Sequence, residues 1–113
     1  MSENKNFWQA EEEKLEGMRQ RSINTGGQKA IDTLAKRNKR PVRDLIGDLT
    51  DPGTDFFELS VLAGFGMDYP GVDDVPCAGI VTGIGKIHGN WTMIMANDSR
   101  VKAGAYFPIT LKK

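Results

Sequence analysis

The hydrophobic pattern of the chain changes from helical to extended at one turn, Asp51-Pro52-Gly53. This tripeptide is a strong turn signal, because proline presets φ and glycine accepts a positive φ. Before the turn, apolar residues recur at helical spacing, and after it they form short extended runs. A chain of 113 residues has room for one domain or part of one. We therefore predict helices in the first half and a small sheet in the second.

Three helices are predicted before the turn, over residues 7–23, 28–38 and 41–49. The first has a weak apolar stripe, so it needs another surface to pack on, or it frays. Gly26-Gly27 ends it. The third begins at Pro41. It has the clearest amphipathic pattern of the chain, at i, i+3, i+4 and i+7: Val42, Leu45, Ile46 and Leu49.

Three strands are predicted after the turn, over residues 56–59, 78–87 and 91–96, with a loop over 62–76. His88-Gly89-Asn90 joins the last two strands as a hairpin turn, because Gly and Asn tolerate positive φ. The nearly continuous apolar run 91–96 predicts burial on both faces, and hence a central strand. Four side chains of this hairpin are expected to be mostly buried: Ile80, Ile84, Trp91 and Ile94.

The expected elements amount to the opening part of a larger α/β unit, an α+β fragment rather than a finished domain. A hairpin and one short strand are too few for a self-sufficient sheet. A new apolar segment also begins at Tyr106, shortly before the last residue, Lys113. We therefore divide the chain into an N-terminal helical extension, residues 1–25, and an incomplete domain, residues 26–113. The unpaired edge of strand 91–96 is expected to promote self-association.

The charges balance overall but are segregated along the chain. Fifteen Lys and Arg face fifteen Asp and Glu, which excludes a nucleic-acid binder that works by bulk positive charge. Residues 29–43 carry six basic groups and one acid, whereas residues 44–80 carry eight acids and no base. Two explanations remain open. The charges form two solvated faces, or the basic cluster meets the phosphates of a ligand or the acids of a partner.

The candidate reactive residues all have a structural explanation. His88, the only histidine, is expected at a solvated hairpin tip, and a metal site is not expected there. Cys77, the only cysteine, precedes a buried strand and is expected to be a small core residue. Asp73-Asp74 is expected to be a solvated turn. Gly83-x-Gly85 lacks the third glycine of a dinucleotide fingerprint, so close packing explains it better. We predict no catalytic residue and no metal ligand.

The loop after strand 91–96 is the remaining place for binding groups. Arg100 and Lys102 are followed by Gly104, which lets a backbone approach a ligand. Together they suit a phosphate or a thioester carbonyl. The alternative is an ordinary capping loop.

The sequence lacks the marks of membrane or export targeting. No stretch approaches the ~20 apolar residues of a membrane span. The first residues have no apolar core and no small-residue cleavage site of a secretory signal. We therefore expect no membrane contact and a cytoplasmic location, or the mitochondrial matrix in a eukaryote, although no transit peptide is seen.

Four collinear segments of the chain resemble one known family. They are the basic helix that leads through VRDLI to LTDPG, then FFEL, then GIVTGIGKIHGN with its hairpin, and last ANDSRVKAGAYFPITLKK. Over about residues 26–113 they are similar to the N-terminal region of the carboxyltransferase (β) subunits of biotin-dependent acyl-CoA carboxylases. The last segment leans towards the branch that acts on methylcrotonyl-CoA or geranyl-CoA, more than towards the propionyl-CoA branch.

The resemblance implies a fold and a reaction. The fold is crotonase-like (ClpP/crotonase), built of repeated ββα units, with this chain as its N-terminal part: short helices followed by an antiparallel hairpin. The reaction is the transfer of a carboxyl group from carboxybiotin to an acyl-CoA, with the biotin carried by a partner protein and none bound by this chain alone. The implied partners are an acyl-CoA, the biotin carboxylase and biotin carrier subunits, and further copies of a full-length subunit.

The resemblance also suggests which residues bind CoA and implies that the isolated chain is inactive. The candidate contacts for the CoA phosphates are seven cations: Lys36, Arg37, Lys39, Arg40, Arg43, Arg100 and Lys102. Family members are several times longer, and this sequence stops before their glycine-rich oxyanion-hole segments and their biotin-side domain. Because enolisation of a thioester needs donors placed at the developing oxyanion, we expect the isolated chain to be inactive. The alternative is a non-catalytic module that binds CoA or a protein partner.

Overall fold

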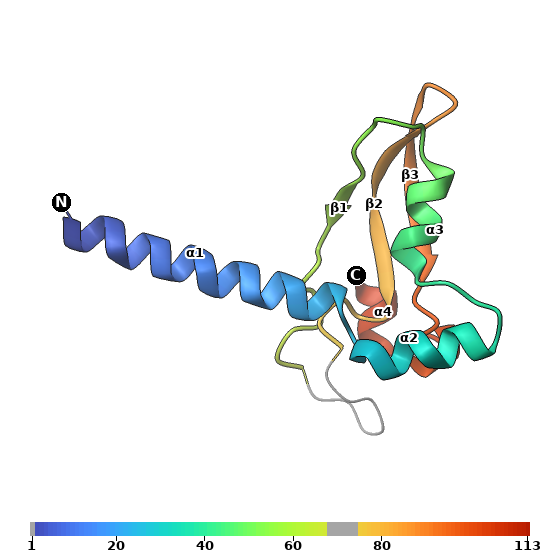
Figure 1. Ribbon diagram of the computed structural model, residues 1–113, viewed down its shortest axis with the longest axis horizontal. Coiled ribbons are helices and arrows are strands. Elements are labelled where there is room, and N and C mark those ends of the chain that lie inside the picture. The colour runs from blue at the N-terminus through green and yellow to red at the C-terminus, as the bar shows by residue number, and fades with distance from the viewer. Residues whose placement is uncertain (1, 68–74) are drawn as a thin grey trace.

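A computed structural model describes residues 2–67 and 75–113. The elements in chain order are α1 (Ser2–Ile23), α2 (Gly27–Lys36), α3 (Val42–Leu49), β1 (Phe57–Leu59), β2 (Ile80–Ile87), β3 (Asn90–Asn97), a 3-10 turn η1 (Lys102–Gly104) and α4 (Pro108–Lys112). The fold therefore combines helices with a small antiparallel sheet. Figure 1 shows α1 extending away from the sheet, whereas α2, α3 and α4 lie close to it.

The three predicted helices are confirmed, with shifted ends. α1 begins at Ser2 rather than at residue 7, and Pro41 precedes α3 as its cap rather than starting it. α2 ends at Lys36, two residues early, and nearby Asn38 has a φ of 54°, which is not compatible with a continuing helix. Gly26-Gly27 separates α1 from α2 with φ values of 77° and 57°, a conformation that favours glycine.

α1 is the longest helix but a polar one. Its sequence, SENKNFWQAEEEKLEGMRQRSI, has no continuous apolar face, and Phe7, Trp8 and Leu15 are exposed on it. None of the described helices combines the length and the hydropathy that a membrane crossing requires.

The sheet has the strand order β1-β2-β3, and both pairings are antiparallel. β2 and β3 pair along their whole length, from Ile80 opposite Asn97 to Ile87 opposite Asn90. The predicted hairpin is confirmed but is tighter than expected, because Asn90 is already a strand residue. His88 and Gly89 alone make the turn, with φ values of 50° and 77°. Two positive φ values in a two-residue loop match the right-handed twist of the strands.

The prediction of a central strand at 91–96 is wrong. β2 is central and β3 is an edge strand among the described residues. Ile80 and Ile94 are buried as predicted, but Trp91 is 69% exposed and Ile84 37% exposed. The reason is that α3 covers only the face to which Ile94 points, while Trp91 and the residues alternating with it point to the other face.

Two small apolar clusters form the core. One joins α3 to the sheet: Val42, Ile46, Cys77, Val81 and Ile94. The other joins the segment just before β2 to the C-terminal segment: Val75, Ala78, Val101, Phe107 and Ile109. A side chain at Gly83 would collide with the ring of Phe56, and one at Gly85 would press on Thr50. These two glycines therefore allow close packing, as the sequence predicted.

The loop predicted over 62–76 is described only in part. Residues 61–66 form turns that lead away from β1. Residues 68–74, which include the predicted Asp73-Asp74 turn, lie outside the described residues.

Candidate functional site

A cavity of about 370 Å³ lies between α2 and the turn that follows β3. The α2 wall carries Lys29, Thr33 and Arg37, whose i, i+4, i+8 spacing places them on one face of the helix. The facing wall carries Ser99 and Arg100. The remaining lining residues are Gly26, Ala30, Leu34 and Ala103. None of the described residues that line it is acidic, so cations and hydroxyl groups dominate its polar surface.

Arg100 is the most firmly held of these cations. Its Nε and Nη2 atoms donate to the Asp98 carboxylate, at 3.0 and 2.8 Å, and both side chains are only 4% exposed. Its Nη1 atom donates to the backbone oxygen of Ile23, at 2.9 Å. Arg100 therefore forms a fixed part of the wall, and its charge is largely balanced by Asp98.

Arg43 is held in a similar way, next to the same helix end. Its Nη2 and Nε atoms donate to Glu58 at 2.6 and 3.1 Å, and its Nη1 lies 3.5 Å from the Ile23 oxygen. Burial alone lowers the pKa of Arg43, but the contact with Glu58 raises it, and the net pKa is above the ordinary value. Because carbonyl groups at a helix C-terminus lack helical partners, two guanidinium groups stabilise the end of α1.

Cys77 is buried as predicted, but its thiol also has polar neighbours. The Nζ atom of Lys113 lies 3.1 Å from the Cys77 Sγ atom and 2.6 Å from the Ile80 oxygen. Arg43 Nη2 approaches the same sulfur at 3.5 Å. The thiol therefore lies where an apolar cluster meets two partly buried cations.

The other predicted cations lie on the surface. Arg40 pairs with Asp48 at 2.6 Å, and this hydrogen bond raises the pKa of Arg40. The side chains of three further residues are exposed: Lys36, Lys39 and Lys102. The structure thus brings Arg37 and Arg100 together in one cavity, but not all seven candidates.

Sequence reasoning missed three polar side chains of this cavity, namely Lys29, Thr33 and Ser99. The signal for Lys29 was present, because it lies two helical turns before Arg37 on the same face. Ser99 had no comparable signal, since it reaches the cavity only through the turn after β3.

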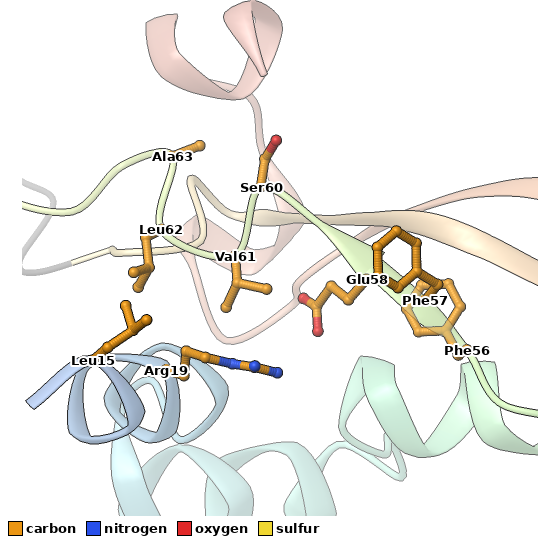
Figure 2. A pocket seen from close by; sticks show the side chains of 9 residues that line it. All are labelled: Leu15, Arg19, Phe56, Phe57, Glu58, Ser60, Val61, Leu62 and Ala63. Carbon is orange, nitrogen blue, oxygen red and sulfur yellow. The ribbon is translucent and has the colours of Figure 1, made fainter. Parts of the chain in front are cut away.

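A second cavity, of about 620 Å³, separates α1 from the segment that contains β1. Figure 2 shows Leu15 and Arg19 of α1 facing Val61, Leu62 and the carboxylate of Glu58. Its lining is mostly apolar, and its one carboxylate is already paired with Arg43. This groove therefore offers a surface for packing rather than an acid–base pair.

The described residues offer no metal centre. Across residues 2–67 and 75–113, no three His, Cys, Asp or Glu side chains converge closely enough to hold a metal ion. His88 is exposed at the hairpin tip, where it was expected.

Comparison with known proteins agrees with the resemblance of the four segments. Residues 34–113 match the family described as carboxyl transferase domain. The methylcrotonoyl-CoA carboxylase beta chain of Dictyostelium discoideum is 52% identical over 88 residues, which are 78% of this chain.

Solved structures of related proteins share the fold. Transcarboxylase 12S, crystallised with methylmalonyl-coenzyme A and methylmalonic acid, superposes with a TM-score of 0.67 and 26% identity over 82% of this chain. The beta subunit of geranyl-CoA carboxylase from P. aeruginosa superposes with a TM-score of 0.62 and 30% identity over 93% of the chain.

The matched proteins are much longer than this chain. The chain spans 15% of the Dictyostelium protein and 18% of each of the two solved chains. Within that span, the family match covers the last residues of α2, all of α3, the whole sheet and the turn after β3. The chain therefore belongs to the carboxyl transferase domain family, as a fragment of a carboxyltransferase subunit.

Proposed function

We propose that this chain is part of a subunit that transfers a carboxyl group from carboxybiotin to an acyl-CoA, and that it supplies scaffold and a CoA phosphate site. The observation that carries the proposal is the cationic cavity between α2 and the turn after β3. Two of its cations, Arg37 and Arg100, lie within the stretch that matches the family.

The chemistry of CoA suits this cavity. CoA carries a diphosphate and a 3′-phosphate, and arginine holds phosphate oxygens through two parallel hydrogen bonds. Arg37 provides the exposed guanidinium of the cavity wall. Lys29 adds a second positive charge on the same face of α2. Arg100 shapes the cavity wall, because its guanidinium is held in place by Asp98 and the Ile23 backbone oxygen. The other five candidates do not line the cavity, and we propose that they add only to the general positive field of the chain: Lys36, Lys39, Lys102, Arg40 and Arg43.

The remaining parts of the proposal concern the complete subunit. Its fold is crotonase-like, with residues 26–113 as the opening portion and residues 1–25 as an extension. Its biotin is carried by a partner, and it works as a homo-oligomer with biotin carboxylase and carrier subunits. Its acyl group belongs to the methylcrotonyl or geranyl branch. The 52% identity to a methylcrotonoyl-CoA carboxylase chain and the superposition on geranyl-CoA carboxylase support this branch.

The isolated chain is proposed to be inactive. Its cavity has cations for phosphates, but enolisation of a thioester also needs donors aimed at the developing oxyanion. Of the two arginines that line the cavity, Arg100 is engaged with the Asp98 carboxylate and the Ile23 backbone oxygen, and Arg37 is exposed to solvent.

A calorimetric titration at low salt tests the CoA site. We expect CoA to bind more tightly than dephospho-CoA, and both affinities to fall steeply as salt screens the charges. Equal and salt-independent affinity for the two ligands, or no heat at millimolar CoA, would confine the CoA site to a longer protein.

The second candidate is a non-catalytic module whose basic cluster meets a protein partner. The segregated charges favour it, since residues 29–43 are basic and residues 44–80 acidic. A reading frame that continues past Lys113 into glycine-rich ββα repeats supports the carboxyltransferase subunit. A stop codon there, without a second piece encoded nearby, supports the module.

A further inference from the structure

The thiol of Cys77 lies against the side-chain amine of Lys113. The distance between the Lys113 Nζ atom and the Cys77 Sγ atom is 3.1 Å. Cys77 is 5% exposed, so the two groups meet at the edge of the core and not on an open surface. Two reacting atoms held ~3–3.5 Å apart are already in an arrangement from which a bond can form.

Buried contacts of the chain itself place Lys113 beside the thiol. Ile109 of α4 and Ala78, the neighbour of Cys77, belong to one apolar cluster. Thr110 Oγ1 donates to the Ala78 oxygen at 2.7 Å, and Figure 1 shows α4 beside the beginning of β2. The N–H group of Lys113 donates to the Ile109 oxygen at 3.0 Å, as in a helical turn. The backbone of α4 therefore fixes where the Lys113 side chain starts.

Two backbone oxygens fix where this side chain ends. The Lys113 Nζ atom donates to the oxygen of Ile80 at 2.6 Å and to the oxygen of Cys77 at 3.1 Å. Ordering a flexible lysine side chain costs conformational entropy, and this cost is met when the chain folds. A reaction between the amine and the sulfur therefore joins two groups that the fold has already positioned.

Arg43 and Glu58 complete the surroundings of the sulfur. The Cys77 Sγ atom lies 3.5 Å from Arg43 Nη2 and 3.7 Å from Glu58 Oε1. Arg43 and Glu58 are paired with each other, and their side chains are only 17% and 13% exposed. Because a thiol attacks an oxidant as the thiolate, a carboxylate at this position can receive the thiol proton. The cluster thus combines a nucleophilic sulfur, a proton acceptor and an amine.

We propose that Cys77 and Lys113 form an oxidative cross-link, in which hydrogen peroxide converts their contact into a sulfenamide bond between Sγ and Nζ. Peroxide reaches the buried sulfur when α4 opens locally, and closure returns Lys113 to it. The cross-link is independent of the CoA site, because neither residue lines the cationic cavity.

The first step oxidises the sulfur. Sγ attacks one oxygen atom of hydrogen peroxide, the O–O bond breaks, and the departing hydroxide leaves as water with the thiol proton. Peroxide is thereby reduced, and Cys77 becomes a sulfenic acid.

The second step forms the S–N bond without further oxidation. The Lys113 ammonium releases one proton to solvent, and Nζ attacks the sulfur of the sulfenic acid. The S–O bond breaks, and the hydroxide takes a second proton from the nitrogen and leaves as water. The cross-linked chain has therefore lost two hydrogen atoms in total, and it contains no added oxygen.

The cross-link has two consequences for the chain. A sulfenic acid that finds no partner proceeds to sulfinic and sulfonic acids, which are not reduced back by thiols, so capture by Lys113 protects the sulfur. The bond also closes a loop between residues 36 positions apart and restricts the unfolded chain. The cross-linked chain should therefore melt at a higher temperature than the reduced chain.

Mass spectrometry of the peroxide-treated chain tests the proposal. The folded chain is treated with a small molar excess of hydrogen peroxide, the remaining thiol is alkylated, and the chain is digested. We expect a peptide pair joined through Cys77 and Lys113, lighter by two hydrogen atoms than the separate peptides. Dithiothreitol should release the pair, since a thiol reduces the S–N bond. The same treatment in urea should give oxygen adducts of Cys77 in its place.

Two lysine substitutions form the matched comparison. Lys113→Arg keeps the positive charge but replaces the amine by a guanidinium that stays protonated, so the yield of the cross-link should fall to about a tenth or less. Cys77 should then gain oxygen atoms. Lys112→Arg changes the exposed neighbour and should leave the yield unchanged. Circular dichroism checks that both variants keep the fold.

Three results overturn the proposal. Oxygen adducts of Cys77 in the folded chain, with Lys113 left free, mean that the amine does not capture the oxidised sulfur. Links from Cys77 to Lys112 or to other lysines, as frequent as those to Lys113, mean that the position of Lys113 has no part in the reaction. A thiol that stays unmodified in the folded chain, although it reacts in urea, means that Cys77 is an inert core residue.

Discussion

Asp98 accepts hydrogen bonds from both the backbone N–H and the guanidinium of Arg100, at distances from 2.8 to 3.2 Å. The pair is almost completely buried, at one edge of the cationic cavity. The second terminal nitrogen of Arg100 reaches Ile23, at the end of α1. Asp98 therefore fixes the cavity wall and, through Arg100, joins the α1 end to the turn after β3.

Asp98→Asn is expected to destabilise the chain by about 3 kcal/mol, because removing one partner of a buried pair leaves the other charge uncompensated. Urea denaturation followed by circular dichroism measures the loss. Asp48→Asn is the matched control, since it breaks the exposed pair with Arg40, and exposed pairs contribute little. Equal effects of the two substitutions would contradict a structural role for Asp98.

Asp51 is expected to make the stability of the hairpin depend on pH. Its carboxylate accepts hydrogen bonds from the N–H groups of Gly89 and His88, each at 2.7 Å. The hydrogen bond from Gly89, together with that from His88, lowers the pKa of Asp51 below its ordinary value. The charged Asp51 carboxylate therefore stabilises the folded chain fully when the pH is above the pKa that Asp51 has in the unfolded chain. This stabilisation is lost as the pH falls through the lower pKa of Asp51 in the folded chain.

Thermal melts of Asp51→Asn test this dependence. At pH 7 the variant should melt a few degrees below the unmodified chain, and the difference should shrink towards zero in acid. Asp55→Asn, at an exposed site in the same loop, should change little at either pH. A difference for Asp51→Asn that persists unchanged at acid pH would show that the carboxylate charge is not the cause.

Two glycine substitutions should shift stability in opposite directions. Gly83→Ala places a methyl group against the Phe56 ring and the Phe57 backbone oxygen, so it should destabilise the chain by about 1–3 kcal/mol. Gly47 lies inside α3 with open space around it, so Gly47→Ala should stabilise by up to about 1 kcal/mol. Denaturation midpoints of the two variants provide the comparison. A neutral Gly83→Ala would mean that the sheet and Phe56 do not approach so closely.

Local signals explain why most elements could be predicted. The helix of Val42 and Ile46, the Asp51-Pro52-Gly53 turn and the β2–β3 hairpin each depend on residues close together in sequence. Which face of the sheet is covered depends on α3, more than 30 residues before β3 in the chain. The run WTMIMA is apolar on both faces, so its composition could not reveal that Trp91 is exposed and Ile94 buried.

The candidate site was predictable only as a set of cations. Segregated charge identified Arg37 and Arg43, and the loop after strand 91–96 identified Arg100, but neither signal revealed their different environments. Arg43 is paired because Glu58 arrives from β1, and Arg100 because its own turn returns Asp98 to it. The Arg43 pair joins a helix to a strand, and the Arg100 pair depends on the conformation of its turn. Only the three-dimensional structure therefore distinguishes an available cation from an engaged one.

Arg37 and Arg40 provide the sharpest test of the cavity, because they are three residues apart, both exposed, and carry the same charge. Arg37 lines the cavity, whereas Arg40 pairs with Asp48 outside its lining. If phosphate binds in the cavity, Arg37→Ala should weaken CoA binding about three- to fivefold, the loss expected for one exposed ion pair below ~1 kcal/mol. Arg40→Ala should weaken it less, and only through the general field that salt removes. Titration calorimetry at two salt concentrations measures both variants. If the two lose the same affinity, and both losses vanish at high salt, the cations act as a diffuse patch and the cavity has no specific part in phosphate binding.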